Sequence, residues 1–189
     1  MQGVATAFDA KIKTSEGVIE ASGTFKEGED IAFDASFDTD IVAPMALAKR
    51  LPLPETVKIP DLTAVQANGD ISYGPNTTRL PKFTFAAEGP GISVNYSGAI
   101  DASDGVKAGG DFEAKLDDMS IVTPYLKTPI EALDLVKNVD AKGTMDWNGS
   151  RLTLPAFNGS VDGTGLTASF NGSGSYEKTL ALSLSLIHI

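Results

Sequence analysis

The chain of 189 residues contains no cysteine, and it has only one histidine and one tryptophan. Without thiolates there is no disulfide and no cysteine-ligated metal. The single histidine, His188, stands next to the last residue, so neither a histidine-rich zinc site nor a serine–histidine–aspartate triad has a plausible imidazole. No pair of carboxylates is fixed as an acid and base. These absences predict a protein that is not an enzyme and that carries no cofactor.

Basic residues are also scarce. Fifteen lysines and arginines face 25 aspartates and glutamates, so the net charge is −10. This charge repels phosphates and excludes nucleic acid as an expected partner. Two acidic clusters, Asp38-Thr39-Asp40 and Asp117-Asp118, lack the glycine and glutamate of a calcium-binding loop, so no metal site is predicted.

Long hydrophobic runs are missing as well. The longest one near the middle covers residues 41–48, far short of the ~20 residues that span a bilayer. What the chain has instead is alternation. In residues 31–38, IAFDASFD, apolar and polar side chains take turns, which is typical of a strand with one buried face. A counterpart is predicted at residues 112–118, at an offset of about 80, and another begins at Leu180.

A longer stretch is repeated. Residues 65–100 return, changed, as residues 139–176: Gly69 and Gly98 correspond to Gly143 and Gly172, both at an offset of 74. Glycines that are spaced along the chain suit many strands joined by tight turns. In the second copy we predict turns at 148–149, 158–159 and 162–163, because Asn-Gly and Asp-Gly favour the positive φ of tight hairpins.

Between the strands, Asp40 with Pro44 and Ser120 with Pro124 resemble helix starts. We therefore predict one short helix near 41–51 and another near 121–134. The predicted fold is mainly β, with tandem β-meander repeats that form a curved antiparallel sheet and one short helix in each repeat. The expected divisions are the tail of a preceding repeat (1–27), a first repeat (28–101), a second repeat (102–177) and the start of a further one (178–189). Both ends fall inside strand patterns, so we expect a fragment of a longer protein.

Apolar side chains should collect on one face of this sheet and form a groove. The residues predicted to line it are Ile31, Phe33, Phe37, Phe83, Phe85, Ile92, Val94, Tyr96, Phe112, Leu116, Leu166 and Phe170. A closed core would show the same alternation, so the sequence leaves groove and core open. An aromatic platform for sugar, built from residues such as Trp147 and Tyr73, is less favoured than packing, because these residues fall on the apolar faces of strands.

The strand-then-helix stretches DIAFDASFDTDIVAPMALAKRLPLP and FEAKLDDMSIVTPYLKTPIEAL, the pattern VxAxGxxxxxxxRL and the later GxGLxASFNGSG (163–174) resemble the C-terminal β-repeats of AsmA-like proteins. The resemblance covers nearly the whole chain. It implies a periplasmic segment of a Gram-negative envelope protein whose parent is anchored in the inner membrane. It also implies a role in outer-membrane assembly and in moving phospholipids between the membranes, with acyl chains as partners of the apolar face. The alternative is a structural or adhesive β-repeat array of a bacterial surface protein.

Overall fold

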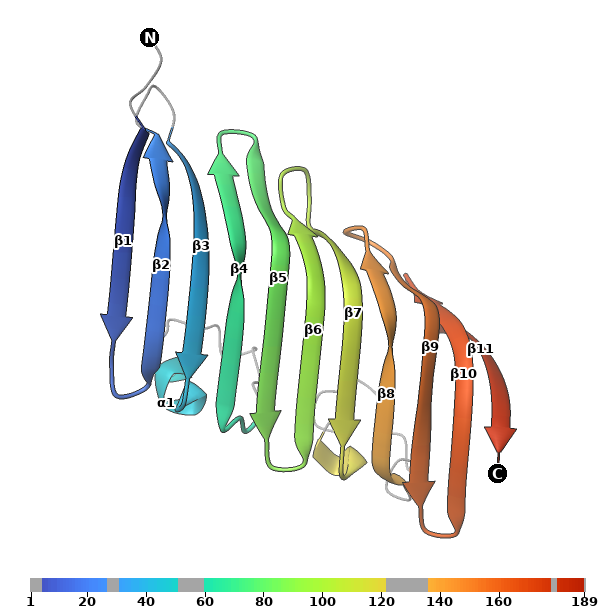
Figure 1. The fold of residues 1–189 in the computed structure, drawn as a ribbon. Coiled ribbons are helices and arrows are strands. Elements are labelled where there is room, and N and C mark those ends of the chain that lie inside the picture. The colour runs from blue at the N-terminus through green and yellow to red at the C-terminus, as the bar shows by residue number, and fades with distance from the viewer. Residues whose placement is uncertain (1–4, 27–30, 51–59, 122–135, 178–179, 189) are drawn as a thin grey trace.

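The computed structural model describes residues 5–26, 31–50, 60–121, 136–177 and 180–188 (Figure 1). These residues form one open antiparallel sheet of 11 strands, in which every strand pairs with its neighbours in the chain. The prediction of a mainly β, antiparallel fold is therefore confirmed. The strands are β1 (Ala5–Lys13), β2 (Gly17–Lys26), β3 (Ala32–Ile41), β4 (Ala64–Gly74), β5 (Thr77–Gly89), β6 (Ile92–Asp101), β7 (Lys107–Leu116), β8 (Val136–Trp147), β9 (Leu152–Gly163), β10 (Leu166–Tyr176) and β11 (Leu180–His188).

The alternation of the sequence sets the two faces of the sheet. In β3, Phe33 and Phe37 are less exposed than Asp34, Ser36 and Asp38, which point to the opposite side. The register carries this division across the sheet, because residues directly opposite each other in an antiparallel pair share a face. Apolar residues thus meet apolar residues or glycine from strand to strand, and we call these two sides the apolar face and the polar face.

The repeat is visible in the pairing. Phe83 of β5 lies between Gly69 of β4 and Gly98 of β6. In the second copy, Phe157 of β9 lies in the same way between Gly143 of β8 and Gly172 of β10. Each glycine leaves room on the apolar face beside a phenylalanine ring, so the offset of 74 marks equivalent positions in two copies of one four-stranded unit.

Each copy also carries a proline in its middle strand. Pro81 of β5 and Pro155 of β9 lie where the pairing with both neighbouring strands shifts register. Proline has no amide hydrogen to donate to the ladder, and a bulge removes the need for one. The two prolines are also 74 residues apart, which ties these irregularities to the repeat.

The register corrects the predicted match between β3 and β7. Phe37 pairs with Gly69, and Phe112 pairs with Gly143, so the two strands correspond at an offset of 75. An offset of 80 would match residues of the apolar face in one strand with residues of the polar face in the other. The reason is that 80 and 75 differ by an odd number, and successive side chains of a strand point to opposite faces.

The prediction of one short helix in each repeat is not confirmed. The first unit contains α1 (Pro44–Ala48), whereas the second has a three-residue 3₁₀ turn, Met119–Ile121, and residues 122–135 lie outside the described part. Asp40, the predicted cap, remains in β3 opposite Gln66, and Ala43 takes the N-cap position without a side-chain bond. A helix of five residues is too short to be stable without tertiary support.

The predicted turn at Asn158-Gly159 is also wrong, because both residues lie inside β9. The turn at Asn148-Gly149 does occur, and Gly149 has a positive φ angle. The turn predicted at 162–163 lies two residues later: Asp162 and Gly163 end β9, and the turn is at Thr164-Gly165, where Gly165 has the positive φ. Gly159 has no positive φ. A Cβ at this position would come within 2.9 Å of Cζ of Phe170 on the neighbouring strand, so this glycine gives space to a ring.

A single layer of strands leaves little room for a core. The buried apolar residues of the described part are Ile41, Ala87 and Ala168, at 9%, 5% and 7% exposure. Most other apolar side chains are half-buried, because only neighbours on the same face of the sheet cover them, and some large ones, such as Ile12, Tyr73 and Leu184, are exposed. Within the described residues, no helix has the length and hydropathy needed to cross a membrane.

Candidate functional site

The apolar face is a continuous surface that crosses the whole sheet. One row of paired residues runs from Ile12 on β1 through Phe85 on β5 and Phe112 on β7 to Leu184 on β11. Parallel rows lie on either side of it. No second layer covers this face in the part of the chain that the structure describes. Among the described residues, this face is therefore covered only by its own side chains.

Most of the predicted groove residues lie together on this face. The register places on it Phe33, Phe37, Phe83, Phe85, Ile92, Val94, Tyr96, Phe112, Leu116 and Phe170. Ile31 precedes β3 and is 61% exposed. Leu166 begins β10, and its side chain lies outside the described part.

Aromatic rings link the rows. The rings of Phe33 and Tyr73 stack with centroids 5.2 Å apart, and Phe83 lies 6.3 Å from Phe37 and 6.1 Å from Tyr96. Such pairs stabilise neighbouring strands beyond the area that they bury. The aromatic rings of the apolar face thus contact one another across the strands, and no described element lies over them.

Tyr96 brings a polar group to this floor. Its hydroxyl donates to the carbonyl of Gly109, 3.1 Å away, and lies 3.2 Å from the carbonyl of Ala99. Burial, followed by the negative charge of Asp146, raises the pKa of Tyr96 above its usual value. The side chain lies over Gly98, whose added Cβ would come within 2.6 Å of the hydroxyl. The tyrosine is therefore held flat on the sheet, with its hydroxyl satisfied by backbone.

Two phenylalanines extend the site beyond the predicted residues. Phe8 and Phe25, with Thr6 and Phe33, line a hollow of about 410 Å³ at the start of the sheet. Thr6, Phe25 and Phe33 share one row of the apolar face, and Phe8 belongs to the next. Phe8, Ala10 and Ile12 alternate with charged residues in the sequence, but no sequence signal shows that three rings from three strands surround a space.

A second hollow lies on the other side of the sheet. It has a volume of about 1080 Å³ and extends from β5 to β11. Each strand contributes consecutive residues, such as Asn95, Tyr96 and Ser97, whereas Val94 and Gly98 are not part of the lining. A hollow over the apolar face would be lined by residues two apart, such as Val94, Tyr96 and Gly98. This hollow is lined instead by Asn95 and Ser97, which flank Tyr96 and point to the polar face, so the hollow lies on the polar face. The predicted apolar groove and this hollow of about 1080 Å³ are therefore different surfaces.

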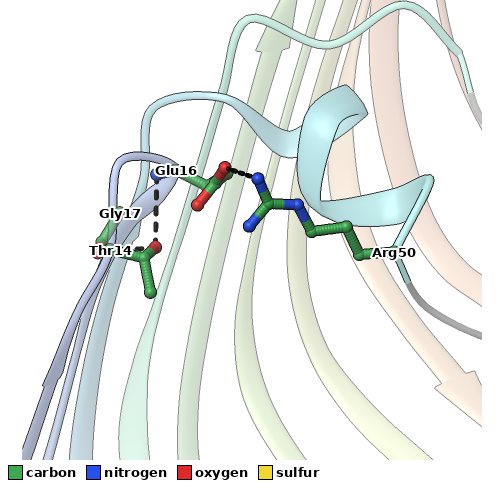
Figure 2. A network of polar contacts seen from close by, with 4 residues as sticks. All are labelled: Thr14, Glu16, Gly17 and Arg50. Carbon is green, nitrogen blue, oxygen red and sulfur yellow. Dashed lines mark hydrogen bonds and ion pairs between the residues drawn. The ribbon is translucent and has the colours of Figure 1, made fainter.

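A polar cluster fixes the end of the sheet near α1 (Figure 2). The carboxylate of Glu16 is 2.8 Å from the guanidinium of Arg50, and the amide of Glu16 donates to the hydroxyl of Thr14. The carbonyl of Glu16 accepts from the amides of Val42 and Ala43. The turn between β1 and β2 thereby holds the segment that leads into α1.

Glu16 is only 5% exposed, and its neighbours favour the ionised form. A hydrogen bond from the hydroxyl of Ser15 is the main cause that lowers the pKa of Glu16, and Thr14, the backbone and Arg50 add to it, while burial opposes. The bonds of Glu16 join the β1–β2 turn to the segment that leads into α1, so we assign it a structural role.

The described residues contain no group of three or more histidines, aspartates or glutamates close enough to hold a metal ion. Comparison with models of protein families, with curated proteins and with solved structures found no match. The two faces of the sheet are therefore the candidate binding surfaces.

Proposed function

We propose that the apolar face binds acyl chains of lipids and that the chain acts without catalysis as a periplasmic β-repeat segment of an AsmA-like envelope protein. In this role it contributes to outer-membrane assembly and to phospholipid transport between the membranes, with its parent anchored in the inner membrane. One observation carries the proposal: apolar side chains cover one side of a single-layer sheet, and no described element covers them.

The energetics suit a lipid. Each methylene that leaves water contributes about 0.8 kcal/mol, so about eight methylenes laid against the face contribute about 6 kcal/mol before the cost of ordering the chain. Apolar contact has no directional requirement, so an acyl chain can occupy successive rows. An exposed apolar surface of this extent is typical of sites that meet another apolar body.

The repeat supports the same proposal. Equivalent phenylalanines, Phe83 and Phe157, recur 74 residues apart with the same glycine neighbours, so each unit presents a similar apolar surface. Stacked units extend a surface in one dimension. We include in this proposal that the sheet is curved and is built of tandem meander repeats.

The alternative, a structural or adhesive array, requires that the apolar faces close on each other as a dry core. The described part offers one layer, so no such interior is present within it. The test is to purify the chain without detergent and to analyse extracted lipids by mass spectrometry. Stoichiometric phospholipid is expected. A protein that carries no lipid and takes up none from vesicles contradicts the proposal.

A further inference from the structure

The polar face contains two kinds of surface. Over β1–β4 its side chains bind one another: Ser36 donates to Asp70 (2.7 Å), Ser72 donates to Asp34 (2.6 Å), and Lys11 pairs with Glu20. These groups are satisfied across the strands and have less capacity left for a ligand.

Over β5–β11 Glu113 likewise pairs with Lys115 (3.0 Å). The hollow of about 1080 Å³ lies here, and the asparagines that line it have no such partner among the described residues. One row of residues that pair from strand to strand lines this hollow. It consists of Asn95, Glu113, Lys142, Asn158, Asn171 and Ser185. A second row includes Ser97, Asp111 and Thr144 on β6–β8, and Ser173 pairs with Ser183 farther along. The structure shows no side-chain hydrogen bond for the three asparagines in its described part.

The spacing of the sequence explains this surface. Asn95 and Ser97, and likewise Asn171 and Ser173, are two residues apart, so each pair lies on the same face of its strand. An Asn-x-Ser triplet in a strand therefore places an amide and a hydroxyl side by side. Amides and hydroxyls both donate and accept hydrogen bonds, so the two rows offer both kinds of group.

We propose that this hollow, which we call the polar groove, binds a linear neutral glycan that lies across the strands. A sugar chain presents hydroxyls that donate and accept, as the free amides and hydroxyls of the groove do. Neighbouring strands are about 4.7–4.9 Å apart, close to the length of one pyranose unit in an extended chain, so successive strands can meet successive sugars.

The charges of the groove favour a neutral occupant. The carboxylate of Glu113 pairs with the ammonium of Lys115, 3.0 Å away, so the lining charges that remain are one carboxylate, Asp111, and one ammonium, Lys142. A polyanionic glycan would therefore meet no excess of positive charge there, on a chain whose net charge is −10. An extended peptide fits less well, because peptides join sheets at an edge through backbone groups, and the backbone of β5–β10 beneath this groove is already paired on both sides. The proposal does not rest on lipid binding, since it uses the opposite face.

The test measures binding of cellohexaose, chitohexaose and maltohexaose to the whole chain by calorimetry and by amide shifts in NMR spectra. At least one is expected to bind, with shifts centred on Asn158 and Asn171. The variant Asn158→Val/Asn171→Val removes two amides but keeps residues that favour strands, and it should weaken binding at least tenfold. The control Ser22→Val/Thr24→Val changes the polar face of β2, outside the groove, and should bind as the unmodified chain does.

Circular dichroism establishes that each variant folds. If the valine variant does not, Asn158→Ser/Asn171→Ser shortens both side chains without adding apolar surface, and it should also weaken binding at least tenfold. Three outcomes overturn the proposal: no hexasaccharide binds, binding is unchanged by the asparagine variants, or an anionic oligosaccharide or a polar peptide binds more tightly than every neutral glycan.

Discussion

Phe85 offers the sharpest test of lipid binding, because its neighbour in the chain lies on the opposite face. Phe85 pairs with Ala67 on one side and Tyr96 on the other, in the central row of the apolar face. Thr84 pairs with Asn68 and Ser97 on the polar face. The variants Phe85→Asp and Thr84→Asp thus add the same charge at adjacent positions, one on each side of the sheet.

The expected difference follows from desolvation. A polar group covered without a partner costs about 2–3 kcal/mol at the lower end of the measured range, and an acyl chain laid over the Phe85→Asp variant would cover the new carboxylate in this way. At about 1.4 kcal/mol for each factor of ten, lipid binding should weaken about 30- to 150-fold. Loss of the half-buried ring should also lower the free energy of unfolding by about 1 kcal/mol, roughly half of what full burial of a phenylalanine contributes.

The assay is transfer of a fluorescent phospholipid from vesicles to the purified chain, with circular dichroism to verify that each variant folds. Thr84→Asp should bind lipid as the unmodified chain does, because its carboxylate remains in water. The reasoning is refuted if both variants bind equally well, or if Thr84→Asp loses as much binding as Phe85→Asp. Either result would mean that the apolar face is not the surface that meets the lipid.

Two further predictions concern stability. Gly98→Ala should lower the free energy of unfolding by about 1–3 kcal/mol, since its Cβ would lie 2.2 Å from the carbonyl oxygen of Gly109. Gly74→Ala, whose Cβ would meet nothing nearer than 3.9 Å, should change it by less than ~0.5 kcal/mol in urea titrations, and equal losses would contradict the glycine argument. The folded chain lowers the pKa of Glu16, so this carboxylate stabilises the fold above pH 4.5 and ceases to do so as the pH falls through its folded pKa. Glu16→Gln should therefore be less stable than the unmodified chain at pH 7, and the gap should close below pH 4.5; a gap that widens on acidification would contradict the assignment.

The sequence predicts the two faces well because period-two alternation is a local property. IAFDASFD already separates Phe33 and Phe37 from Asp34 and Ser36, and the strand keeps that division. The glycine offset of 74 likewise survives, because Gly69 and Gly143 hold equivalent places beside Phe83 and Phe157.

The errors arise where a local signal competes with pairing between strands. Asn158-Gly159 has the composition of a turn, but Gly159 lies opposite Phe170, and the ring uses the space that the glycine leaves. Asp40 has the composition of a helix cap, but the ladder with β4 extends the strand past it. Neither partner can be identified from neighbouring residues, since Asp40 and Gln66 are 26 positions apart.

The polar groove could not be located from the sequence, although its residues could. Asn-x-Ser triplets at Asn95, Asn158 and Asn171 are visible in the chain, and each indicates two polar groups on one face of a strand. That the three amides lie on adjacent or nearby strands depends on the register. That they lack partners, whereas Ser36 and Ser72 have them, depends on the side-chain geometry of the described residues.

The two proposals are independent for a physical reason. Successive residues of a strand point to opposite sides of a single-layer sheet. Phe157 and Asn158 are therefore adjacent in the chain but belong to different surfaces. A ligand on either face meets side chains that the other ligand does not touch. The backbone between them is already paired, and neither binding event requires it to change. Lipid binding without glycan binding, or the reverse, would therefore refute one proposal and leave the evidence for the other unchanged.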